Sequence, residues 1–175
     1  MKKVELSIKE QGIICAESLA GPNGFVVFGA SGDLVRRKLL LSLFRLFNQS
    51  LLCENFYFLG VGRTELSDEQ FRLNARQAIR ENSPDLSTKE LESFTNHLYF
   101  SVGDYGDISL YSDIKSKINQ LDEKYHTGRN VIYYLSVPPL LYEQIIEMLG
   151  TSGLSCLVVT DLKLKSKLVV EKPFG

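Results

Sequence analysis

The stretch Phe25-Val-Val-Phe-Gly-Ala-Ser-Gly-Asp-Leu34 decides the fold of this chain. Four apolar residues run directly into Gly29-Ala-Ser-Gly32, and a segment with an apolar residue at every fourth position follows. A strand, a tight glycine turn and a helix in this order place backbone N–H groups and the positive end of a helix dipole where a phosphate can bind. The sequence therefore predicts a nucleotide-binding chain.

The glycine turn limits the kind of nucleotide site. Gly29 stands where the strand must turn sharply, and Gly32 stands where the backbone must approach a pyrophosphate closely. The pattern is not a full Gly-x-Gly-x-x-Gly, because Ser31 takes the middle glycine position and Val35 the third. A Walker phosphate loop is excluded, because it needs a second glycine five residues after the first, and Leu34 stands there. On this motif alone, an ordinary strand–helix turn without a ligand is the alternative.

Composition excludes several other classes of protein. The 175 residues are 44% hydrophobic, which suits one domain with a sizeable core, and the net charge of -1 argues against a general nucleic-acid binder. No run approaches the roughly 18–20 apolar residues of a membrane span, and the first residues lack the apolar core of a signal peptide. Three scattered cysteines fit reduced thiols in the cytoplasm, and two isolated histidines predict no metal site.

The order of apolar segments predicts an α/β fold. Residues 1–23 are expected to form an N-terminal arm, and residues 24–175 a single domain. Strands are expected at about 25–29, 56–61, 98–102, 130–136, 155–159 and 167–170, and helices at about 33–49, 67–82, 88–96, 108–124 and 140–149. This alternation is typical of a Rossmann-like, doubly wound, mostly parallel sheet, in which ligands bind at the carboxyl ends of the strands.

The residue after the second strand bears on the choice of coenzyme. An NAD enzyme usually places Asp or Glu there, to accept a hydrogen bond from the ribose 2′-hydroxyl. This chain has Arg63, which only donates hydrogen bonds and suits a 2′-phosphate. Ser31 is a second candidate donor. NADP is therefore expected, while Glu65, two residues on, keeps NAD open as the alternative.

Four motifs together resemble one enzyme family. They are Gly29-Ala-Ser-Gly-Asp-Leu34, Gly60-Val-Gly-Arg63, Tyr134-Leu-Ser-Val-Pro-Pro139 and Glu171-Lys-Pro-Phe-Gly175. Their order and approximate spacing resemble those of glucose-6-phosphate dehydrogenase, from about Phe25 to the last residue. The resemblance implies that the parent protein oxidises carbon 1 of glucose 6-phosphate with NADP to the 6-phosphogluconolactone, the first step of the pentose phosphate pathway.

The same resemblance assigns roles to individual residues. The residues implied for coenzyme binding are Gly29, Ser31, Gly32, Asp33 and Leu34 in the phosphate loop, Arg63 at the 2′-phosphate, Tyr105 near the coenzyme, and Tyr134 and Pro138 beside the nicotinamide. Lys172 matches the lysine that contacts the substrate, and it is also expected to lie at the coenzyme.

The family also has a C-terminal β+α domain that carries the histidine general base, and no match to it occurs in this sequence. Neither His97 nor His126 stands in a position to replace that base. The chain is therefore expected to bind NADP without turning over glucose 6-phosphate. The longer protein is expected to form a homo-oligomer through the missing domain. A non-catalytic NADP-binding sensor or interaction module is the alternative function.

Overall fold

A parallel sheet of five strands forms the centre of the computed structural model, which describes residues 20–83, 85–155 and 166–171. The strands are β1 (Asn23–Phe28), β2 (Phe56–Gly62), β3 (Leu98–Val102), β4 (Val131–Leu135) and β5 (Lys167–Val170). Their order across the sheet is β3-β2-β1-β4-β5. The strand order reverses between β1 and β4, and such a reversal is where doubly wound folds bind ligands.

The register places the end of β1 at the centre of the carboxyl edge. Phe28, its last residue, pairs with Val61 of β2 on one side and with Leu135 of β4 on the other. The glycine turn that follows Phe28 therefore emerges between the ends of two neighbouring strands.

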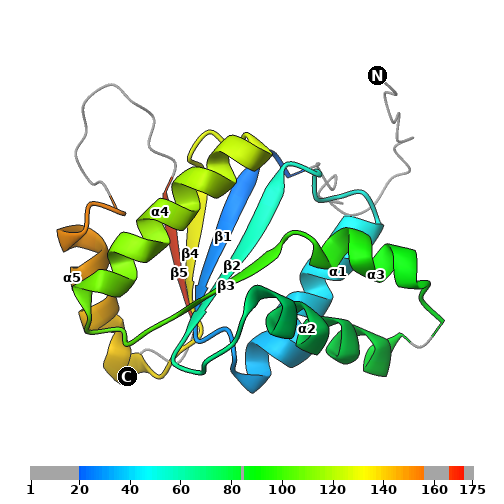
Figure 1. Cartoon of the computed structure of the whole chain (residues 1–175), viewed down its shortest axis with the longest axis horizontal. Helices are drawn as coiled ribbons and strands as arrows, with labels where there is room; N and C mark the ends of the chain where they lie inside the picture. The colour runs from blue at the N-terminus through cyan, green and yellow to red at the C-terminus, as the bar shows by residue number, and fades with distance from the viewer. Residues whose placement is uncertain (1–19, 84, 156–165, 172–175) are drawn as a thin grey trace, which may run out of the picture.

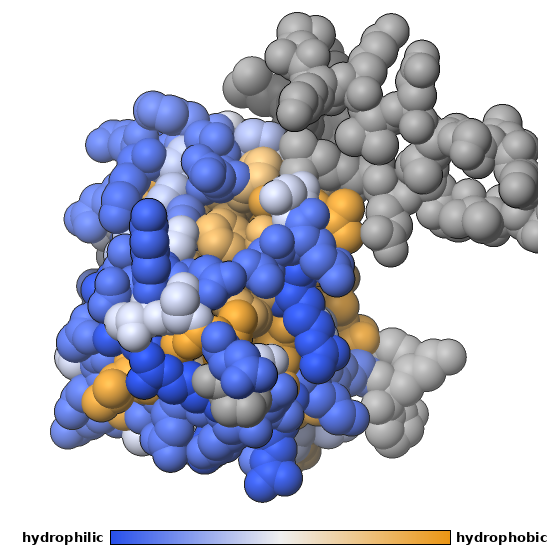
Figure 2. Space-filling model, turned by 90° about the vertical axis from the view of Figure 1, so that its right-hand side faces the viewer, coloured by the Kyte–Doolittle hydropathy of each residue, from blue (hydrophilic) through white to orange (hydrophobic). Residues whose placement is uncertain are grey.

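Helices cover both faces of the sheet, as the doubly wound prediction requires (Figure 1). One face carries α1 (Leu40–Asn48), α2 (Asp68–Asn82) and α3 (Thr88–Thr95), and the other carries α4 (Ile108–Tyr125) and α5 (Tyr142–Thr151). Seen from the side of α1, α2 and α3, the molecule is mostly hydrophilic, with hydrophobic residues showing between the polar ones (Figure 2). Among the described residues, no helix is both long and apolar enough to cross a membrane.

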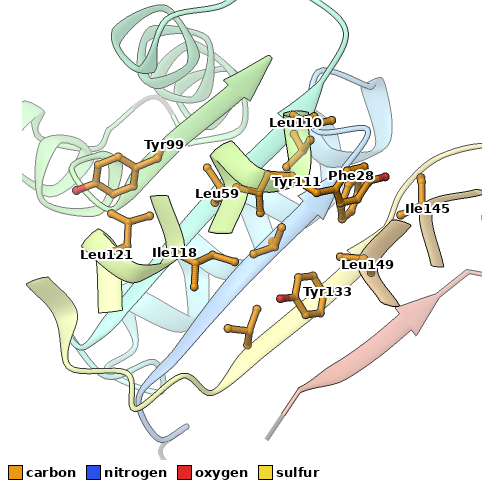
Figure 3. Packing of buried hydrophobic residues seen from close by; sticks show 14 of the residues in the cluster. Phe28, Leu59, Tyr99, Leu110, Tyr111, Ile118, Leu121, Tyr133, Ile145 and Leu149 are labelled. Carbon is orange, nitrogen blue, oxygen red and sulfur yellow. The ribbon is translucent and has the colours of Figure 1, made fainter. Parts of the chain in front are cut away.

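Alternation along the strands divides the core in two. Phe56 and Phe58 of β2 pack towards α1, α2 and α3, whereas Tyr57 and Leu59 point to the opposite face. Figure 3 shows this second cluster, in which side chains of α4 and α5 meet those of β1, β2 and β4. Because β2 is buried along its whole length, its near-continuous apolar sequence is that of a central parallel strand.

Local signals set where the longer helices begin. Ser67 accepts a hydrogen bond from the backbone N–H of Gln70, and the Gln70 side chain accepts one from the backbone of Ser67. Ser87 and Glu90 make the same reciprocal pair at the start of α3. Each pair is a capping box, which satisfies N–H groups that the first turn of a helix leaves free.

Two predicted elements differ from the structure or cannot be compared with it. The helix expected at 33–49 contains a wide π-helical turn, η1 (Val35–Leu39), in which the Leu40 N–H donates to the Val35 carbonyl, before α1 begins. An apolar residue at every fourth position suits this wider turn as well as an α-turn, so the pattern does not separate them. Most of the strand expected at 155–159, like residues 1–19, lies outside the described residues.

Candidate functional site

The glycine turn after β1 is a sharp bend packed against β4. Gly29 has a φ of +82°, and its N–H donates to the Val61 carbonyl at 2.9 Å. A Cβ on Gly29 would lie 2.1 Å from the carbonyl oxygen of Ser136. The Gly32 N–H then donates to the Gly29 carbonyl at 2.9 Å and closes the turn. Only glycine fits at position 29, both by backbone conformation and by space.

The turn forms the floor of an open hollow of about 340 Å³. Residues from the ends of four strands line this hollow: Gly29, Ser31, Gly32, Arg63, Thr64, Tyr105, Ser136, Val137, Pro138 and Leu141. Leu141 belongs to η2 (Pro139–Leu141), a short 3₁₀ turn that precedes α5. Six residues predicted for the coenzyme site therefore come together here, although they are scattered between positions 29 and 138.

Hydrogen-bond donors gather on the β2 side of the hollow. The Thr64 hydroxyl donates to the Ser31 hydroxyl at 3.2 Å, and Arg63 stands beside them in the same lining. The central carbon of the Arg63 guanidinium lies 5.9 Å from the centre of the Tyr105 ring. Thr64 was not among the predicted residues, although its place directly after Arg63 at a strand end is a signal that could have identified it.

Tyr105 is a buried member of this lining. Only 5% of the surface of Tyr105 is exposed. Burial raises the pKa of the Tyr105 phenol, while the Gly29 backbone and the Arg63 guanidinium oppose that rise. The phenol is therefore neutral at physiological pH and offers an uncharged ring face to the guanidinium.

A second cavity of about 260 Å³ adjoins the first. Ser31 and Thr64 line both, and the remainder of the second cavity is formed by Ala30 of the glycine turn and by residues of η1, α1, the β2–α2 connection and α2. At its rim, Arg36 makes two hydrogen bonds to the Glu81 carboxylate, at 3.1 and 3.2 Å. The pair of hydroxyls thus separates an open hollow over the glycine turn from a pocket between helices.

Three predicted site residues do not line the hollow, and a fourth lies outside the described part. Asp33 forms an exposed ion pair with Arg37, with 2.6 Å between Oδ1 and Nε, and Leu34 leads into η1. The Tyr134 hydroxyl donates to the Glu171 carboxylate, and burial together with this carboxylate raises the pKa of Tyr134 to about 12. Lys172 lies outside the described residues.

Both histidines of the chain lie at the amino ends of the strands, opposite the hollow. The His97 ring stacks on Phe56 at 4.4 Å, and its Nδ1 lies 2.9 Å from the Phe56 carbonyl oxygen. Burial lowers the pKa of His97. His126 caps the C-terminal end of α4 in a left-handed conformation, five residues before β4 begins. Nowhere in the described ranges do three or more His, Cys, Asp or Glu residues group as metal ligands would.

The chain is similar to known dehydrogenases over most of its length. It is 41% identical over 150 residues to the glucose-6-phosphate 1-dehydrogenase of Aggregatibacter actinomycetemcomitans, which is 86% of this chain and 29% of that protein. The enzyme of Bacillus subtilis (strain 168) is 34% identical over 150 residues, again covering 29% of that protein. The chain thus spans less than a third of the length of these two relatives.

Solved structures agree with these sequence matches. The crystal structure of glucose-6-phosphate 1-dehydrogenase from Mycobacterium avium matches 88% of this chain and 30% of its own, with a TM-score of 0.71 and 28% identity. A structure described as glucose-6-phosphate dehydrogenase in complex with its substrate glucose-6-phosphate shares the fold, with a TM-score of 0.73 and 23% identity.

A family model described as "Glucose-6-phosphate dehydrogenase, NAD binding domain" matches residues 26–175. That description makes the coenzyme class a nicotinamide dinucleotide. The match covers both the glycine turn and every strand end that lines the hollow. The chain therefore belongs to the family of glucose-6-phosphate dehydrogenase NAD-binding domains.

Proposed function

We propose that this chain binds NADP in the hollow over the glycine turn and is the coenzyme domain of a glucose-6-phosphate dehydrogenase. The domain comprises residues 24–175, with residues 1–23 as an N-terminal arm. In the complete enzyme, bound NADP accepts a hydride from carbon 1 of glucose 6-phosphate, and the product is 6-phosphogluconolactone. Lys172, by its place in the Glu171-Lys-Pro motif, is the residue proposed to contact substrate and coenzyme.

The observation that carries the NADP proposal is a set of three side chains that can donate hydrogen bonds. Arg63 and Thr64, directly after β2, line the hollow together with Ser31 of the glycine turn. An NAD site would place a carboxylate here to accept from the ribose 2′-hydroxyl. A doubly charged 2′-phosphate instead needs a cation and hydroxyl donors, which is the chemistry of this group.

The glycine turn would hold the pyrophosphate. Gly29 and Gly32 keep side chains away from the floor of the hollow, so that the backbone can approach an anion. The ion pair of Asp33 with Arg37 offsets a negative charge that would otherwise repel the pyrophosphate next to the turn. Pro138 and Val137, on the β4 side, offer an apolar wall to the rest of the dinucleotide.

Calorimetric titration of the chain with NADP and with NAD tests this proposal. We expect tighter binding of NADP, and we expect Arg63→Ala to weaken NADP binding about 10- to 100-fold, as for a lost hydrogen bond to a charged group. The same variant should leave NAD binding nearly unchanged. Arg45→Ala, at an exposed arginine of α1, is the matched control and should change neither affinity. Equal binding of both coenzymes by the unaltered chain would contradict the proposal.

We further propose that this chain binds coenzyme without turnover. Oxidation of a hydroxyl needs a base to take its proton as the hydride leaves. His97 is stacked on Phe56 and His126 caps α4, both at the edge of the sheet opposite the hollow. The chain mixed with NADP and glucose 6-phosphate should therefore give no rise in absorbance at 340 nm. Substrate-dependent NADPH formation by the pure chain would refute this.

The compartment and assembly of the complete protein are separate proposals. Unpatterned cysteines support a reducing compartment, so we place the protein in the cytoplasm. We propose that the complete enzyme is a homo-oligomer through its C-terminal domain. Fractionation of the source cells and sedimentation of the full-length enzyme test the two statements separately.

A further inference from the structure

The Arg63 guanidinium lies against an aromatic ring rather than a carboxylate. Ion pairs between described residues join five other pairs of side chains and do not include Arg63. Its aromatic neighbour is the Tyr105 ring, whose centre lies 5.9 Å from the guanidinium carbon. This distance is within the range of a cation–π interaction.

We infer that Tyr105 is a positioning residue: its ring holds the Arg63 guanidinium at the rim of the hollow and so increases discrimination in favour of a coenzyme that carries a 2′-phosphate. The inference rests on the proposed function, in which Arg63 reads that phosphate. It assigns Tyr105 a role in specificity that acts through Arg63, distinct from direct contact with the coenzyme.

Tyr105 is itself held rigidly. The Phe28 ring meets it edge-on, with 5.9 Å between centroids and 68° between planes. Tyr111, which stacks on Phe28, donates its hydroxyl hydrogen to the Tyr105 carbonyl at 2.8 Å. The turn that carries Tyr105 is closed by a hydrogen bond from the Gly106 N–H to the Asp104 carboxylate, at 2.8 Å. The ring is therefore part of the core under α4, where Figure 3 shows Phe28 and Tyr111 side by side.

Contact between the guanidinium and a fixed ring has a definite energetic consequence. An arginine side chain has many rotamers, and a ligand that fixes one of them reduces the conformational entropy of the side chain. This loss of entropy opposes binding. A ring that already restricts the guanidinium removes part of that loss before the ligand arrives. A neutral ring also leaves the charge of the guanidinium available, whereas a carboxylate partner would compete with the phosphate. The effect should appear only in ligands that carry the 2′-phosphate.

The test uses 2′,5′-ADP and 5′-AMP as probes, because they differ by the 2′-phosphate alone. Their affinities are measured by calorimetry for the unaltered chain, Tyr105→Leu and Tyr105→Phe. We expect Tyr105→Leu to weaken 2′,5′-ADP binding about two- to fivefold more than it weakens 5′-AMP binding. Tyr105→Phe keeps the ring and should keep the full preference. In an Arg63→Ala background, Tyr105→Leu should have no further effect on that preference.

Different outcomes separate this inference from the proposed function. An equal loss of both probes in Tyr105→Leu would overturn the inference, because a structural defect or a direct contact would then suffice. The same is true if Tyr105→Phe loses the preference as Tyr105→Leu does. If Tyr105→Leu fails to fold, as circular dichroism would reveal, Tyr105→Met takes its place, since its flexible side chain refills the space without a ring. An unaltered chain with no preference for 2′,5′-ADP would overturn the proposed function and this inference with it.

Discussion

Replacement of Gly29 by alanine should destabilise the chain strongly. The residue has a φ of +82°, and its new Cβ would lie 2.1 Å from the Ser136 carbonyl oxygen and 3.0 Å from Val137 Cγ1. The left-handed conformation costs an alanine about 1–2 kcal/mol, and relief of the overlap about 1–3 kcal/mol more, so we expect a total loss of about 2–5 kcal/mol. That is a large share of the roughly 5–15 kcal/mol by which a domain is stable.

Two other glycines of the chain separate these contributions. Gly128 has a φ of +61°, but no heavy atom lies within 4 Å of the position that a Cβ would take, so Gly128→Ala should lose only about 1 kcal/mol. Gly150 lies in α5 with neither constraint, so Gly150→Ala should gain about 0.5–1 kcal/mol through helix propensity.

Urea denaturation followed by circular dichroism measures the free energy of unfolding of all three variants. We expect the order Gly150→Ala, unaltered chain, Gly128→Ala, Gly29→Ala, from most to least stable. A Gly29→Ala variant as stable as Gly128→Ala would show that the carbonyl at the end of β4 yields freely. The tight packing of the turn against β4 would then contribute nothing measurable to the free energy of unfolding.

Two further predictions concern groups away from the hollow. Asp68 accepts hydrogen bonds from the Phe100 N–H at 2.7 Å and from Lys117 Nζ at 3.1 Å. Asp68→Ala should therefore lower the free energy of unfolding by about 2–3 kcal/mol in the same urea assay. Asp113→Ala, at an exposed carboxylate, is the control and should change it by less than about 0.5 kcal/mol. Burial lowers the pKa of His97 below its ordinary 6.5, so its contribution to stability is present above pH 6.5 and is lost as the pH falls. The urea midpoint should therefore fall less between pH 7 and pH 5 in His97→Gln than in the unaltered chain. An equal fall of the midpoint in both proteins would contradict the burial argument.

Sequence periodicity was sufficient for most of the secondary structure. The segments 56–61 and 98–102 contain little but apolar residues, and they form β2 and β3 within one residue of the expected bounds. Ser67 and Ser87 stand just before the helices that they cap. These signals are local, because a strand or a cap depends on residues a few positions apart, and a single chain read in order contains them.

The candidate site was predictable only in part. Gly29 and Gly32 were predicted because a sharp turn restricts residue type, and Arg63 because it follows a strand directly; all three line the hollow. Thr64 was not predicted, although it follows Arg63 at a strand end, because its contact with the Ser31 hydroxyl is visible only in the folded chain. Tyr134 was also predicted for the site, and it does not line the hollow. Its hydroxyl bonds Glu171, a contact between β4 and the residue after β5 that no local pattern contains.

The sequence by itself determined the alternation of strands and helices, the position of the sharp turn and the family of the chain. The tertiary structure decided which strand ends lie side by side, and with them the pairing of Arg63 with Tyr105 and of Ser31 with Thr64. The physical reason is how far apart in the sequence the interacting residues stand. Backbone conformation depends on neighbours along the chain, whereas these contacts join residues 33 to 42 positions apart, which meet only after the sheet has brought β1, β2 and β3 together.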